Sequence, residues 1–255
     1  MGTPPEHMVY AWWDWDYQNP LRNQQSALNE ITVEIEIHND IELAGTGNGI
    51  YLMVCSGDVD GIGYYFGLQT DVHNNNANVS SRNTGKGLIF SRWKERNLTN
   101  ARIPDGGFME SSGHEGNFIG VRRNYDWGAG KYLLRIGQDG PDDSVGRWYG
   151  LWITDLAVNQ ENWIGSMRFP YINGRALLGP RCYNTVEIYG PPIAPNDIPY
   201  WKVTLHPPKG DGKEATVTDY GFSPFTGGYR NTRFSNEESG AVIYEVGLDH
   251  IPADR

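Results

Sequence analysis

The stretch ITVEIEIH, residues 31–38, alternates apolar and polar side chains without a break. Its apolar side chains, at positions 31, 33, 35 and 37, would share one face, and its polar side chains the other. A period of two is that of a β-strand with one buried face. This stretch therefore predicts a half-buried strand and favours an all-β fold.

Similar short segments, rich in apolar and aromatic residues, recur along the chain. They are residues 51–55, 64–70, 88–93, 132–136, 148–154, 163–169, 185–189, 201–205 and 241–246. Asp60-Gly61 predicts a tight hairpin turn, and no window of a dozen residues has helical periodicity. The sequence thus predicts an all-β jelly roll or concanavalin A-like β-sandwich. We expect one domain over residues 1–255, with a soft boundary in the proline-rich stretch 190–199.

The composition of the chain fits this assignment and narrows the partners. The 32 glycines and 15 prolines suit many turns, and the 9 Trp, 15 Tyr and 8 Phe supply bulky strand formers. A formal charge of −10 argues against nucleic acid and against an anionic membrane surface, because both attract basic proteins. This charge does not argue against neutral sugars as partners. The composition does not determine the oligomeric state.

The sequence gives only limited evidence about the cellular compartment of the protein. No stretch approaches the ~20 apolar residues of a membrane span, and the first residues, MGTPPEHMVYAWW, lack the blocks of a signal peptide. We therefore expect either a cytoplasmic protein or the mature form of a secreted one. Cys55 and Cys182 do not make a disulfide framework; they favour two buried free thiols, with a single bridge as the alternative.

Five glycine- and aromatic-rich segments follow one another in a fixed order. They are Gly63–Gln69, Phe90–Trp93, Gly113–Gly116, Tyr125–Tyr132 and Trp163–Pro170. Together they resemble an uncharacterised family, the domain of unknown function numbered 3472, over roughly residues 30–170. The first segment has one extra tyrosine, and the fourth is slipped by one residue. The resemblance implies a family glutamate at Glu115 and no established activity, and the family's frequent place beside sugar-handling modules favours a glycan partner.

The candidate ligand-binding residues combine aromatic rings with polar groups, as a sugar site requires. In WWDWDY, residues 12–17, a strand would place Trp13 and Trp15 on one face. Glycines beside Tyr65, Gln69 and Glu115 would let a ligand approach closely. The full set is Trp13, Trp15, Tyr65, Gln69, Arg92, Trp93, His114 and Glu115. For each of them the alternative is plain packing in the core or in a turn.

These residues favour a carbohydrate-binding, lectin-like protein. The first alternative is a glycan-cleaving enzyme, a glycoside hydrolase or polysaccharide lyase, with Glu115 as acid or base. The second is a structural domain whose aromatic residues are all core. No familiar catalytic motif or metal-ligand spacing is present. We expect no cofactor; a calcium ion at Asp58 and Asp60 is the alternative, although a hairpin turn explains both residues.

Overall fold

The alternating sequence becomes alternating burial in the computed structural model. In β2 (Glu30–Ile37) every second side chain is buried. The structure describes residues 6–16, 27–41, 43, 48–73, 84–113, 116–190, 197–222 and 231–250. Of these, 63% lie in strands and 3% in helices, so the all-β prediction is confirmed.

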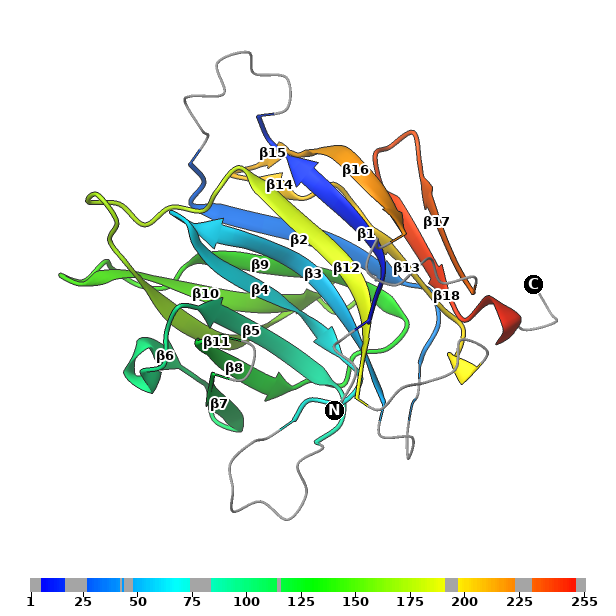
Figure 1. The fold of residues 1–255 in the computed structure, drawn as a ribbon, viewed down its shortest axis with the longest axis horizontal. Coiled ribbons are helices and arrows are strands. Elements are labelled where there is room, and N and C mark those ends of the chain that lie inside the picture. The colour runs from blue at the N-terminus through cyan, green and yellow to red at the C-terminus, as the bar shows by residue number, and fades with distance from the viewer. Residues whose placement is uncertain are drawn as a thin grey trace.

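The strands form two antiparallel sheets, which lie one in front of the other in Figure 1. Sheet A has the order β16 (Thr216–Phe222), β1 (Glu6–Asp14), β12 (Arg181–Tyr189), β3 (Gly49–Val59), β4 (Ile62–Gln69), β5 (Gly87–Trp93), β8 (Phe118–Asn124), β7 (Gly107–Ser112). Sheet B has the order β17 (Thr232–Asn236), β18 (Val242–Val246), β13 (Trp201–Leu205), β2, β9 (Gly130–Gln138), β10 (Gly146–Asp155), β11 (Gln160–Pro170), β6 (Ala101–Arg102).

Four short elements complete the described chain. They are β14 (Lys209–Gly210) and β15 (Lys213–Glu214), which pair with each other, and the 3₁₀ turns η1 (Leu98–Asn100) and η3 (Leu248–His250). No helix among the described residues has the length and apolarity to cross a bilayer. Residues 191–196 of the proline-rich stretch lie outside the described part, and the number of domains stays a prediction.

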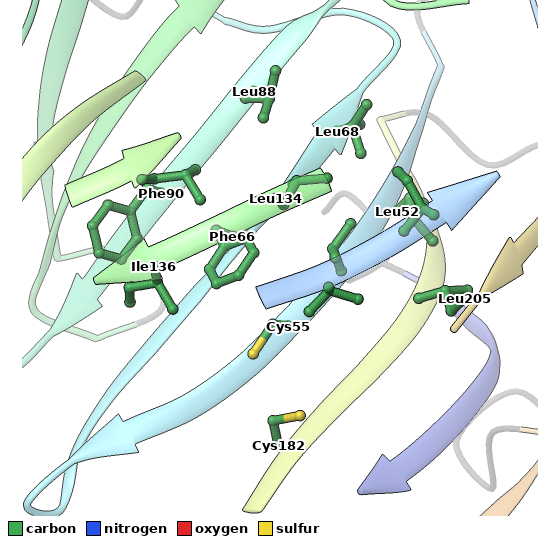
Figure 2. Packing of buried hydrophobic residues seen from close by; sticks show 14 of the residues in the cluster. Leu52, Cys55, Phe66, Leu68, Leu88, Phe90, Leu134, Ile136, Cys182 and Leu205 are labelled. Atoms are coloured by element: carbon green, nitrogen blue, oxygen red, sulfur yellow. The ribbon is translucent and has the colours of Figure 1, made fainter. Parts of the chain in front are cut away.

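The inner faces of the two sheets meet in the main core. Figure 2 shows Leu52 and Phe66 of sheet A directed into the same interior as Leu134 and Ile136 of sheet B. Each of these side chains is fully buried. The neighbouring Cys55 and Cys182 are both buried free thiols. The core thus fixes which face of sheet A points outward.

The Asp60-Gly61 hairpin is confirmed. Asp60 has φ 44° and Gly61 φ 81°, the positive values that a two-residue hairpin turn requires at both central positions. The carboxylate of Asp58 accepts a 2.7 Å hydrogen bond from the Gly61 amide and closes the turn. The hairpin joins β3 to β4 and so sets their register.

Buried hydroxyls and thiols make the fold sensitive to alkali. Burial raises the pKa of Tyr51, Tyr64 and Tyr244 well above the usual value, and burial likewise raises the pKa of the Cys182 thiol. In the unfolded chain these groups ionise near their ordinary values, about 10 for Tyr and about 8.5 for Cys. Their stabilising effect is therefore complete below those values and is lost as the pH rises toward the higher folded pKa.

We expect urea midpoints to fall progressively between pH 8 and pH 11. Tyr64→Phe should flatten this alkaline decline, because the variant has no hydroxyl to ionise at that position. Denaturation curves of both proteins at four or five pH values test this. A wild-type midpoint that holds up to pH 11 would contradict it.

Candidate functional site

The structure divides the predicted site residues between the two faces of sheet A. Tyr65, Gln69 and Trp93 are partly buried on the outer face. Trp13, Trp15 and Arg92 are buried on the inner side, which faces sheet B. His114 and Glu115 lie outside the described residues. The single groove that the sequence predicted is therefore not assembled from the residues that can be placed.

Trp13 and Trp15 belong to the core, so their assignment to a ligand face is wrong. Trp13 is completely buried, and Trp15 is only 4% exposed. The Trp15 indole donates a 2.8 Å hydrogen bond to the carbonyl of Lys213. The alternation in WWDWDY does separate the tryptophans as expected, but its aromatic pair faces inward because that face meets sheet B.

Arg92 is also directed inward. It lies opposite Tyr64, whose side chain is in the core, and residues directly opposite in a sheet share a face. Its guanidinium lies 5.1 Å from the centre of the Phe169 ring, donates to the Arg168 carbonyl and pairs with Glu95 at 3.5 Å. Arg92 thus ties the two sheets together from inside.

The glycines near the predicted site make room for rings of this chain. A Cβ on Gly63 would come within 3.0 Å of the Trp93 indole, and one on Gly116 within 3.4 Å. Trp93 packs between Tyr65 and Phe118, with ring centres 5.8 and 5.5 Å away. We conclude that these two glycines make room for the Trp93 ring.

A glycine is required at position 67 for a different reason. A Cβ there would overlap the carbonyl oxygen of Leu52 on β3. The β3–β4 register shifts between Met53 and Cys55, as in a β-bulge, which brings the β3 backbone close to Gly67. Gly67 is therefore required by strand pairing.

The outer face of sheet A carries a row of three polar side chains, of which only Gln69 was predicted from the sequence as a site residue. Tyr51 of β3 lies opposite Glu187 of β12 on one side and opposite Gln69 of β4 on the other. The next residue of β3, Leu52, points into the core, so all three members of the row point outward. We call Glu187, Tyr51 and Gln69 the polar row.

Two members of the polar row are strongly buried. Glu187 is 6% exposed and Tyr51 is 3% exposed. The Tyr51 hydroxyl has no hydrogen-bond partner among the described residues. Burial raises the pKa of Tyr51 well above its usual value, and the nearby Tyr65 and Glu187 add to the rise. This hydroxyl therefore stays protonated and can donate a hydrogen bond.

An apolar wall borders the row on the β4–β5–β7 side. Tyr51 clusters with Val72, Ile89 and Phe108, all nearly or fully buried. Its ring lies edge-on to Tyr65 at 6.3 Å. The wall reaches from β3 to β7, and the partly buried Met53, Tyr65 and Tyr189 pack against it.

The wall ends at an ion pair between Arg122 and Glu110, whose side chains are 12% and 10% exposed. Arg122 also donates a 3.2 Å hydrogen bond to the His73 carbonyl. The pair closes the wall at the β7 edge of the sheet.

Asp58 and Asp60, the alternative calcium ligands, bind groups of the protein itself. Asp60 pairs with Arg175 at 2.7 Å and accepts a 2.8 Å hydrogen bond from the Leu177 amide. Asp58 closes the hairpin, as described above. The described residues contain no group of three or more metal-ligating side chains. The turn interpretation therefore accounts for both aspartates.

The comparisons with known proteins add a general likeness of fold. No family model and no curated protein matches the chain, so the resemblance to the family numbered 3472 stays a prediction. Several solved structures match at low similarity, including three of peptidases. Scytalido-glutamic peptidase with a transition-state analogue inhibitor has a TM-score of 0.45 at 9% identity and covers 94% of this chain and 98% of its own.

The same peptidase with a peptide-based transition-state analogue has a TM-score of 0.43 at 10% identity, over 95% of this chain and 99% of that chain. SCP-B, a member of the Eqolisin family of peptidases in complex with the tripeptide Ala-Ile-His, has a TM-score of 0.42 at 10% identity over the same shares. Scores at this level carry no argument about activity.

The lectin-like prediction is corrected. The three similar structures named above are peptidases, and none of them is named as a lectin. Trp13 and Trp15, which were to stack on a sugar, lie in the core. The glycan-cleaving alternative depended on Glu115, which lies outside the described residues.

Proposed function

We propose that the chain hydrolyses amide bonds of extended peptides on the outer face of sheet A. Glu187 is the proton-transfer group. The Gln69 amide is the hydrogen-bond donor to the developing oxyanion. The observation that carries the proposal is the polar row itself, in which a strongly buried carboxyl stands beside this amide and the buried Tyr51 hydroxyl.

The spacing of the row suits this chemistry. Directly opposite side chains in antiparallel strands have Cβ atoms about 4.5–5.5 Å apart. Glu187 and Gln69 therefore flank Tyr51 across about 10 Å, two strand spacings. Water activated by the carboxylate and a carbonyl oxygen held by the amide fit between them. Amide hydrolysis needs both a general base and an oxyanion donor.

The same spacing argues for amide hydrolysis over glycoside hydrolysis. Most glycosidases need two carboxyl groups roughly 5–10 Å apart. Among the outward carboxylates of sheet A, Asp219 lies two strands across and four residues along from Glu187, Asp14 one strand across and six residues along, and Glu110 five strands or about 24 Å away. Glu187 is thus partnered by an amide and a phenol, and an acyl group is the better substrate.

The substrate is expected to lie extended on the sheet. Beside the polar row, the outer face offers the partly buried side chains of Met53, Tyr65 and Tyr189, which pack on the buried apolar wall. An extended peptide can place alternate side chains against such a wall. Peptide hydrolysis is also the activity that the names of the similar structures carry, although that likeness adds no weight here.

Glu187→Gln tests the proposal directly. The change keeps the size of the side chain and removes its ability to exchange a proton, so we expect kcat to fall by about 10²–10⁴-fold. Gln69→Leu removes only an oxyanion donor and should cost about 10²–10³-fold. Cleavage of a fluorogenic peptide library, measured from pH 3 to pH 8, gives the rates.

Glu34→Gln is the matched control. Glu34 lies on β2 of the other sheet with a side chain 43% exposed, and its loss should leave the rate unchanged. Thermal melts establish that each variant is folded. Turnover by Glu187→Gln at the wild-type rate would refute the role of Glu187, and a wild-type protein that cleaves no peptide would refute the proposed function.

A further inference from the structure

A second cluster on the outer face of sheet A lies beyond the polar row, toward the β16 edge. It consists of Tyr10 and Trp12 on β1, Tyr183 on β12 and Asp219 on β16. Trp12 lies opposite Tyr183 on one side and opposite Asp219 on the other, so the side chains share a face. We call these four residues the aromatic-acidic cluster.

The rings of the cluster make a compact, partly exposed surface. The centres of Tyr10 and Tyr183 are 6.0 Å apart with planes inclined by 21°, and those of Trp12 and Tyr183 are 4.9 Å apart. The Tyr10 hydroxyl donates a 3.1 Å hydrogen bond to the exposed Asp219 carboxylate. The cluster thus combines three neighbouring π-systems with one carboxylate, which Tyr10 holds in place.

The cluster already binds a cation of this chain. The Arg181 guanidinium lies 5.0 Å from the centre of the Trp12 ring, and its nitrogen lies 3.4 Å from the Asp14 carboxylate. Cations bind to the faces of aromatic rings within about 6 Å, and most strongly to tryptophan. The surroundings of Trp12 are therefore electrostatically suited to a guanidinium or ammonium group.

We propose that the aromatic-acidic cluster is a subsite for the Lys or Arg side chain of a peptide substrate. The inference takes its ligand from the proposed function. Charge complementarity supports it: Asp14 is paired with Arg181, Asp219 contributes an exposed carboxylate to the cluster, and the whole chain carries a formal charge of −10. A negative field also raises the rate at which cationic peptides arrive.

The distance along β12 sets the position of this side chain in the substrate. Tyr183 and Glu187 are four residues apart and face the same way, which is about 13 Å along a strand. An extended peptide covers about 3.3–3.6 Å per residue. The basic residue should therefore lie three or four positions from the cleaved bond.

Paired peptides test the subsite. Each pair differs only in carrying Lys or norleucine at one position, because norleucine keeps the aliphatic chain and lacks the ammonium group. We expect the Lys peptide to bind wild-type protein and the Glu187→Gln variant about fivefold more tightly when Lys is three or four positions from the scissile bond. Fluorescence anisotropy at low salt gives the affinities, and the preference should shrink as salt is added.

Trp12→Ala and Asp219→Asn should each reduce the Lys preference to at most about twofold. Trp152→Ala is the matched control, because Arg135 lies 4.0 Å from the centre of the Trp152 ring on sheet B. This variant should keep the full preference. Equal affinity of wild-type protein for both members of every pair would overturn the subsite, as would a preference that survives both Trp12→Ala and Asp219→Asn.

The outcomes separate the two proposals. Lys-selective binding without cleavage of any peptide would refute the hydrolase and leave the subsite standing. Cleavage that depends on Glu187 but proceeds equally well for Lys and norleucine peptides would refute the subsite and leave the hydrolase standing.

Discussion

Trp13→Ala should destabilise the protein by about 3–5 kcal/mol, the cost of truncating a buried aromatic side chain. Trp13 is completely buried between the sheets and is among the largest side chains of the core. Its removal leaves a cavity that two hydrogen-bonded sheets cannot close by a small movement. Urea denaturation followed by far-ultraviolet circular dichroism measures the loss.

The neighbouring Trp12 supplies the control. It is on the outer face and partly exposed, so Trp12→Ala should cost much less, about 1 kcal/mol. Trp13→Phe should also be mild compared with Trp13→Ala, because the Trp13 indole nitrogen has no hydrogen-bond partner among the described residues. Equal losses for Trp12→Ala and Trp13→Ala would contradict the placement of β1.

Gly67→Ala should cost about 3 kcal/mol or more, although it adds a single methyl group. The new Cβ would overlap the Leu52 carbonyl oxygen and lie 2.9 Å from the Val54 amide nitrogen. Both are backbone atoms of a strand that is paired on its two sides. Relief therefore requires a shift of β3, which also carries Tyr51, so proposed activity should fall together with stability.

Gly221→Ala is the matched change in the same sheet. Its Cβ would meet only the Tyr10 ring, at 3.8 Å, which is ordinary contact. The free energy of unfolding should stay within about 0.5 kcal/mol of the wild-type value. A loss at Gly221 as large as that at Gly67 would mean that the bulge is not the cause.

The strands were predictable where the side chains alternate or where apolar residues run together. Residues 31–38 and 201–205 differ from β2 and β13 by at most one residue at either end. The sequence analysis missed β8 and β16, because FIGVRRN and TVTDYGF contain charged residues at positions that point outward or lie near an edge. Burial on one face is enough for a strand, but it gives a weak pattern over seven residues.

Gln69 was predicted as a site residue, but the polar row as a whole could not be predicted, because its members are brought together by pairing between distant strands. The segment NTVEIYG does predict a strand with Glu187 between two buried residues, and a solvated surface glutamate is the ordinary interpretation. No local signal places residue 187 beside residues 51 and 69. The glycines near Trp93 were interpreted as making room for a ligand, but they make room for the Trp93 ring. A sequence does not distinguish between these two reasons for a glycine.

The position of β1 in sheet A has a consequence for synthesis of the chain. The Thr185 hydroxyl bonds to the Val9 carbonyl across 176 residues, and the other neighbour of β1, β16, is made later still. β1 is made before both of its partners and is thus among the last strands to be paired, although Met8, Val9, Ala11 and Trp13 are completely buried in the folded protein. Until β12 is made, these apolar side chains are exposed and prone to aggregate, and folding that waits for such distant contacts is slow.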